Sequence, residues 1–176
     1  MAEMRVNKVD AARRQIETAI KLLFSNGDPV AIHTLVAAGG RIVRDLCERR
    51  NTPGYILTKS LIKPGKEKAF HTGLSRATNF LKHADRDSED ILENVREEVN
   101  EHLIMLACMF YRDLGYTRTT AMAVFEAWYC AINPEAAEEG LAKVLLDNLF
   151  ADSLRNMNRQ EQLESGRELL LTAKHL

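Results

Sequence analysis

The stretch VNKVDAARRQIETAIKLLFSNGDP, residues 6–29, predicts an α-helix, a turn and the start of a second helix. Apolar residues recur every three or four positions in its first part, as on the buried face of an amphipathic helix. These positions are Val9, Ala12, Ile16, Ala19, Ile20 and Leu23. Asn26-Gly27 is typical of a turn, and Asp28 followed by Pro29 is a standard helix start. The fold therefore begins as two helices joined by a short turn.

The helical pattern continues along the chain, interrupted by proline and glycine. The second helix is expected to end near Arg50, and a capping-box pattern starts the last helix at Asn158, with Glu161 three residues on. Further helices are expected at about 66–84, 89–114, 119–132 and 134–156. Residues 51–65 form a long loop. We therefore expect an all-α, single-domain helical bundle of about six to seven helices over residues 1–176.

Two of these helices carry more specific expectations. The second contains the run Ala37-Ala38-Gly39-Gly40, whose small side chains let another backbone come close, so it predicts a tight packing site and helix-on-helix contacts in a dimer. The fourth has an apolar stripe that should face the core. Its members are Ile91, Val95, Val99, Leu103, Leu106 and Phe110.

Composition is that of an ordinary globular domain, with 176 residues, 45% hydrophobic and 28% charged. The net charge of −1 is unevenly spread. Residues 1–88 carry 16 Lys/Arg and 9 Asp/Glu, a balance of +7, whereas residues 89–176 carry 8 and 16, a balance of −8. This split indicates either a basic surface for a polyanion or two sets of solvated helix faces.

Cysteine usage and the lack of long apolar runs indicate a soluble, cytoplasmic protein with no membrane partner. Cys47, Cys108 and Cys130 are widely spaced, and each lies among helix-patterned apolar residues, so free thiols in a reducing compartment are expected. No apolar run follows the N-terminal charges as in a signal peptide. The longest apolar stretch, 103–111, is far shorter than a membrane span.

The expected helix 66–84 carries a polar stripe beside its apolar face. At 100° per residue, Thr72, Arg76, Asn79 and His83 share one side, next to the face that holds Phe80. Arg76 and His83 lie two turns apart, roughly 10 Å along the axis, within reach of one phosphodiester. Histidine can take the proton of a ribose 2′-hydroxyl, and a guanidinium can stabilise charge on the phosphate. The stripe thus predicts metal-independent cleavage of RNA.

Arg76-Ala-Thr-Asn-Phe-Leu-Lys-His83 resembles the Arg-x(4–6)-His motif of the HEPN superfamily, and 79–87 is similar to a motif of uncharacterised bacterial HEPN-like proteins. The resemblance covers the general fold and about a dozen residues. It implies a helical bundle that forms a homodimer, with two copies of the motif in one cleft. It also implies an endoribonuclease of toxin–antitoxin or phage-defence type, with an antitoxin-type protein partner. The family residue after the arginine is usually polar, and here it is Ala77, so Asn79 would take that role.

We therefore predict a catalytic set of Arg76, His83 and Asn79 that needs no cofactor. Basic residues around the long loop and the stripe are candidates for binding the RNA backbone. The site candidates are Lys66, Lys68, Lys82 and Arg86, and the wider cluster adds Arg41, Arg44, Arg49, Arg50, Lys59 and Lys63. The alternative is a non-catalytic interaction or regulatory module in which the stripe is structural and the lysines keep the chain in solution.

Other candidate sites have simpler interpretations. Arg96 and His102 also fit the motif spacing, but His102 lies on an apolar stripe and is interpreted as a core histidine with a satisfied ring. His83, Asp85 and Asp87 alternate as metal ligands can, yet Asp85, Asp87 and Ser88 are more simply caps of the helix that follows. No metal site is predicted.

Overall fold

The computed structural model describes residues 4–55, 76–83, 85, 88–93, 96–134 and 149–173. These residues hold six helices of eight residues or more and no β-strand. The helices are α1 (Lys8–Phe24), α2 (Pro29–Arg50), α5 (Val99–Asp113), α6 (Thr120–Ile132), α8 (Leu149–Asn156) and α9 (Arg159–Thr172). The all-α bundle expected from the sequence is confirmed.

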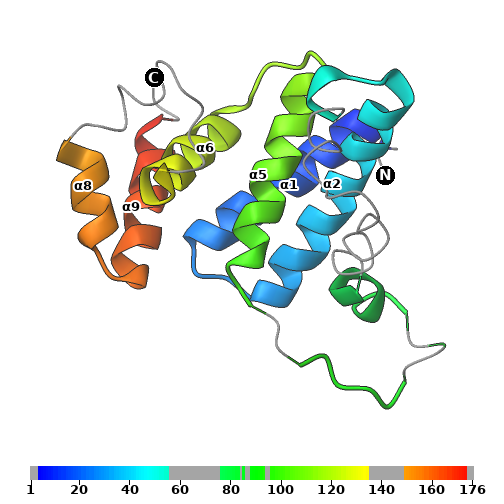
Figure 1. Ribbon diagram of the computed structural model, residues 1–176, viewed down its shortest axis with the longest axis horizontal. Helices are drawn as coiled ribbons and strands as arrows, with labels where there is room; N and C mark the ends of the chain where they lie inside the picture. Colours follow the sequence, from blue (N-terminus) through cyan, green and yellow to red (C-terminus); the bar gives the residue numbers. More distant parts are fainter. Residues whose placement is uncertain are drawn as a thin grey trace.

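The helices form a three-helix group with a second group against one end of it (Figure 1). Helices α1 and α2 make a hairpin, and α5 packs along α2. Helix α6 crosses α1 and α5, and its other side contacts α8 and α9. The C-terminal helices therefore reach the N-terminal hairpin both through α6 and through a direct contact between α1 and α9.

Helix starts follow the capping signals in the sequence. The Asp28 side chain accepts a hydrogen bond from the Ala31 amide at 2.8 Å, directly before Pro29. Asn158 and Glu161 form the complete capping box of α9, which confirms that prediction. Gly115 has a φ of +85° and follows the last turn of α5, where the sequence predicts the helix to close.

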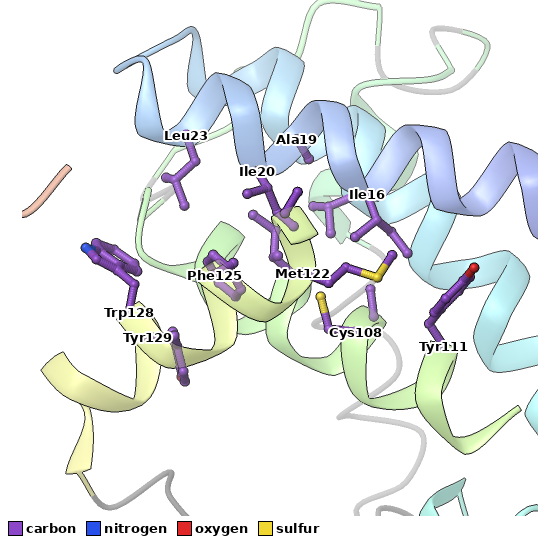
Figure 2. Close-up of a cluster of buried hydrophobic side chains, with 14 of the residues drawn as sticks. Ile16, Ala19, Ile20, Leu23, Cys108, Tyr111, Met122, Phe125, Trp128 and Tyr129 are labelled. Atoms are coloured by element: carbon purple, nitrogen blue, oxygen red, sulfur yellow. The ribbon is translucent and has the colours of Figure 1, made fainter. Parts of the chain in front are cut away.

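The core lies where α1 faces α6 (Figure 2). Ile16 and Ile20 of α1 meet Met122 and Phe125 of α6, and all four side chains are fully buried. Trp128 is also fully buried, and its ring meets the edge of Phe24 at a centroid distance of 5.2 Å. The apolar spacing of residues 6–25 thus marks the face of α1 that enters the core.

The small-residue run of α2 is a tight packing site, as predicted, but it packs inside the chain. A Cβ on Gly39 would lie 3.0 Å from the Ala12 carbonyl oxygen of α1. A Cβ on Gly40 would lie 3.5 Å from the Cβ of Ala107 on α5. The close contacts of Gly39 and Gly40 are therefore made with α1 and α5 of the same chain. The run therefore gives no support to a dimer.

The fourth helix begins ten residues later than the sequence predicts. Helix α5 starts at Val99, and residues 88–93 and 96–98 are not α-helical. Ile91 and Val99, both expected to face the core, are 78% and 38% exposed. Glu98 occupies the N-cap position without a capping hydrogen bond from its side chain. The expected capping by Asp85 and Ser88 was therefore wrong. The expected first turns lack the tertiary packing of an apolar face that most helices in proteins need.

The long loop and the third helix are described in part. Residues 53–55 form a helical turn inside the expected loop, fixed by the carboxylate of Asp113. This carboxylate accepts hydrogen bonds from the Gly54 and Tyr55 amides, both at 3.1 Å, and from the Thr52 hydroxyl. Residues 76–80 are helical, in agreement with the expected third helix, and residues 56–75 lie outside the described part.

A search of the described helices finds none with the length and apolar character needed to cross a membrane.

Candidate functional site

Segment 76–83, defined here as the candidate site segment, is a short helix with a polar side and a half-buried side. Helical hydrogen bonds run beyond residue 80, from the Leu81 amide to the Ala77 carbonyl at 2.9 Å and from the His83 amide to the Asn79 carbonyl at 3.0 Å. The exposed side chains are Arg76, Asn79, Lys82 and His83. The half-buried ones are Ala77, Thr78, Phe80 and Leu81. The division matches the wheel expected from the sequence.

Exposure leaves the proposed catalytic groups accessible to a large ligand. Arg76 and His83 are seven residues apart, so they lie roughly 10 Å apart along a helical axis, with Asn79 one turn from each. A guanidinium and an imidazole at this spacing can contact one phosphodiester from the same side. The surface of a single helix does not enclose such a ligand, so a second surface is needed to exclude water from it.

The inner side of the candidate site segment is tied to the bundle through a buried histidine that sequence reasoning missed. His33 of α2 is 4% exposed. Its Nε2 lies 3.2 Å from the Thr78 Oγ1, and its Nδ1 lies 2.9 Å from the Asn100 Oδ1 of α5. Asn100 in turn donates from its Nδ2 to the Pro29 carbonyl at 3.0 Å. Three segments distant in sequence therefore meet at one imidazole.

The second motif match in the sequence has a different environment from the one expected. His102 is exposed on α5, so the interpretation as a core histidine was wrong. Its Nδ1 lies 2.5 Å from the Tyr129 hydroxyl of α6. Arg96 is also exposed, and its Nε lies 3.8 Å from a carboxylate oxygen of Glu98. The imidazole of His102 is thus engaged with another helix, whereas His83 presents an exposed side chain.

Of the predicted RNA-binding residues, Lys82 is exposed on the candidate site segment. Lys66, Lys68 and Arg86 lie outside the described residues, as do Lys59 and Lys63 of the wider cluster. The arginines of α2 are partly committed to other groups. Arg41 pairs with Asp45 at 2.8 Å, and Arg50 donates to the Leu114 carbonyl at 3.4 Å.

Two buried glutamates form ion pairs that no pattern in the sequence predicts. Glu101 of α5 pairs with Arg159 of α9, whose guanidinium lies 5.5 Å from the centre of the Trp128 ring. Burial raises the pKa of Glu101, and Arg159 opposes that shift only in part. Glu126 of α6 pairs with Arg118 at 2.8 Å. The Glu101–Arg159 pair joins α5 to α9, and the Glu126–Arg118 pair ties α6 to the segment before it. In both pairs the glutamate is buried and the arginine is partly exposed, so we assign them a structural role.

The three cysteines are free, as expected. Cys47 and Cys108 are buried, and burial raises the pKa of the Cys108 thiol well above its ordinary value. Such a thiol is a poor nucleophile at neutral pH. Within the described ranges, no group of three His, Cys, Asp or Glu side chains has the geometry to hold a metal ion.

Comparison with known proteins finds no matching family, no matching curated protein and no matching solved structure. The fold and the candidate site define an all-α protein that exposes an arginine, an amide and a histidine on one short helix. Function must therefore be argued from that surface.

Proposed function

We propose that this chain is a metal-independent endoribonuclease similar to HEPN-family proteins, in which Arg76, Asn79 and His83 act on RNA at a composite site formed by two copies. The observation that carries the proposal is the exposure of these three side chains on one side of the candidate site segment. Lys82 on the same segment adds a cation for the RNA backbone. A toxin–antitoxin or phage-defence role, with an antitoxin-type partner, belongs to this proposal through the family resemblance.

The chemistry assigned to the site is an internal phosphoryl transfer. The imidazole of His83 takes the proton of a ribose 2′-hydroxyl, and the 2′-oxygen forms a bond to phosphorus. The bond from phosphorus to the 5′-oxygen breaks, and that oxygen receives a proton from solvent or from the imidazolium of the second copy. The products are a 2′,3′-cyclic phosphate and a 5′-hydroxyl. Arg76 stabilises the charge on the phosphate oxygens, and Asn79 orients the imidazole or the phosphate.

A second copy supplies what one exposed helix lacks. Removing water strengthens every charge interaction at a reacting phosphate, and a helix on the surface of one chain cannot remove it. Because the close contacts of the small-residue run of α2 are made with α1 and α5 of the same chain, the dimer contact is assigned to the candidate site segment and its surroundings.

The test compares the two arginines that fit the motif spacing. Arg76→Ala should lower the rate of RNA cleavage by about 10²–10³-fold, the typical loss when one preorganised donor is removed. The matched control Arg96→Ala deletes another exposed arginine and should leave the rate unchanged. Wild-type products should end in a 2′,3′-cyclic phosphate or its hydrolysis product. Equal loss of activity in both variants, or a 3′-hydroxyl product, contradicts the proposal.

The second candidate is a non-catalytic interaction module. One observation favours it: Thr78 of the same segment lies at hydrogen-bonding distance from the buried imidazole of His33, so the segment already has a structural role. In that case the exposed side chains mediate contacts between proteins. Arg76→Ala and His83→Ala would then weaken self-association or partner binding, and the wild-type chain would cleave none of a broad panel of RNAs.

A further inference from the structure

We propose that His33 is a positioning residue for the Arg76–Asn79–His83 surface, acting through Thr78 in one defined tautomer. The inference rests on the proposed function where it concerns catalysis. Its structural part stands on the hydrogen bonds of one buried imidazole that reaches α5 on one side and the candidate site segment on the other.

The hydrogen-bond partners determine the tautomer. The Asn100 Nδ2 donates to the Pro29 carbonyl, which fixes the side-chain amide so that its Oδ1 faces His33. A carbonyl oxygen can only accept, so the His33 Nδ1 must carry the proton and donate to it. In the neutral imidazole the Nε2 then has a free lone pair, and the Thr78 hydroxyl donates to it. Every polar atom of this chain of bonds is satisfied.

The position of Thr78 explains why this matters for the site. Thr78 lies between Ala77 and Asn79 on the inner side of a short helix, and a helix of this length is not stable by itself. Its hydroxyl meets an imidazole that α2 and α5 already hold in place. This partly buried hydrogen bond therefore helps to fix the rotation of the helix, and with it the direction in which Arg76, Asn79 and His83 project.

The two histidines near the candidate site segment lie in different environments, because His33 is buried against its inner side and His83 is exposed. His33 is 4% exposed, with both ring nitrogens engaged, so it is not itself presented to a ligand. Histidine at position 83 is exposed instead. The buried imidazole positions the segment, and the exposed one is left to do chemistry.

The experiment uses the full chain and three threonine variants. Thr78→Val keeps the side-chain shape but cannot donate, Thr78→Ser restores the hydroxyl, and Thr34→Val is the matched control. The Thr34 hydroxyl donates to the Val30 carbonyl within α2, so its loss does not touch the segment. The measurements are the nitrogen NMR signals of the His33 ring, amide hydrogen exchange at Leu81 and His83, and the rate of RNA cleavage.

Wild type should show His33 as the Nδ1–H tautomer. Thr78→Val should shift the Nε2 signal and speed exchange at Leu81 and His83 by about fivefold or more, as expected when a partly buried hydrogen bond that holds a local unit is lost. Thr78→Ser should restore both, and Thr34→Val should change neither. If RNA cleavage is present, its maximal rate should fall with the exchange protection in Thr78→Val and recover in Thr78→Ser.

Two outcomes overturn the inference: an Nε2–H tautomer in the wild type, or unchanged exchange at Leu81 and His83 in Thr78→Val. Cleavage that stays at the wild-type rate while exchange accelerates overturns the catalytic part alone. A wild-type chain that cleaves no RNA contradicts the proposed function, while the tautomer and exchange results still decide the structural part.

Discussion

Buried polar side chains in this bundle are satisfied to very different degrees. His33 and Asn100 meet neutral partners with all of their described ring and amide groups paired. Glu101 keeps a charge inside the protein, and burial raises its pKa because Arg159 does not fully offset the loss of water. The burial of Glu101 therefore makes the stability of the fold depend on pH.

The sign of that dependence follows from the raised pKa of Glu101. A carboxyl whose pKa is higher in the folded chain than its ordinary value of 4.5 binds its proton more tightly when folded. Its stabilising contribution is therefore complete below pH 4.5 and is lost as pH rises through the folded pKa. Glu101→Gln removes this titration and keeps an oxygen for Arg159.

We expect the wild type to become more stable relative to Glu101→Gln, with a larger free energy of unfolding, as the pH falls from 7 to 4. Denaturant unfolding at a series of pH values measures the difference. His102 and Glu98 also act on the charge of Glu101. Because both groups are present in the two proteins, the difference in stability between wild type and Glu101→Gln removes their own titration to first order. A wild type that loses stability relative to Glu101→Gln on acidification would show that the ion pair dominates over burial.

Two adjacent glycines of α2 should respond oppositely to alanine. Gly39→Ala places a Cβ 3.0 Å from the Ala12 carbonyl oxygen, which is backbone and cannot move aside, so about 1–3 kcal/mol of stability should be lost. Gly40→Ala meets the Cβ of Ala107 at 3.5 Å, an ordinary contact, and should gain up to about 1 kcal/mol from better helix propensity. Thermal unfolding of both variants measures these two changes in stability. Equal changes in Gly39→Ala and Gly40→Ala would contradict the close approach of α1 to Gly39.

At the scale of helices, the sequence predicted best those elements whose signals are local. Helices α1, α2 and α6 start and end, and helix α9 starts, within a few residues of the expected positions, because capping side chains and apolar spacing lie within each helix. The start of α5 was missed because Ile91 continues the apolar spacing but is 78% exposed. Whether an apolar residue finds a partner depends on the tertiary structure, which spacing alone does not reveal.

Substitution of two isoleucines tests the later start of α5. Ile91→Ala removes a side chain that is 78% exposed and should change the free energy of unfolding by less than about 0.5 kcal/mol. Ile104→Ala empties a fully buried position in α5 and should cost about 2–5 kcal/mol. Similar large losses in both variants would place residue 91 in the core after all.

At the candidate site, too, local sequence patterns predicted exposure but not the contacts between distant residues. The exposure of Arg76, Asn79 and His83 follows from a helical wheel, which needs only the sequence. The contact between His33 and Thr78 joins residues 45 positions apart, and Asn100 lies 67 positions from His33. His33 occurs among apolar residues of α2 with no local pattern that distinguishes it. Such a network can be found only once the helices are placed.

For the whole molecule, the composite site requires two chains. Light scattering of the wild type should give twice the chain mass of 19.9 kDa. If the arginine of one copy works with the histidine of the other, mixing inactive Arg76→Ala with inactive His83→Ala should restore measurable cleavage, because the mixed dimer regains one arginine and one histidine in the cleft. A strictly monomeric chain, or a mixture as inactive as its parts, would exclude a shared site.

The most direct test of the account is the rate of RNA cleavage in EDTA by the wild type, His83→Ala and His102→Ala. The wild type should cleave fully in EDTA, since the proposed mechanism assigns no role to a metal. His83→Ala should be slower by about 10²–10⁴-fold, the typical loss of a general base, with its helical content unchanged. His102→Ala, which deletes the histidine of the other motif match, should retain the wild-type rate. Cleavage retained by His83→Ala, or abolished by EDTA, would contradict the account.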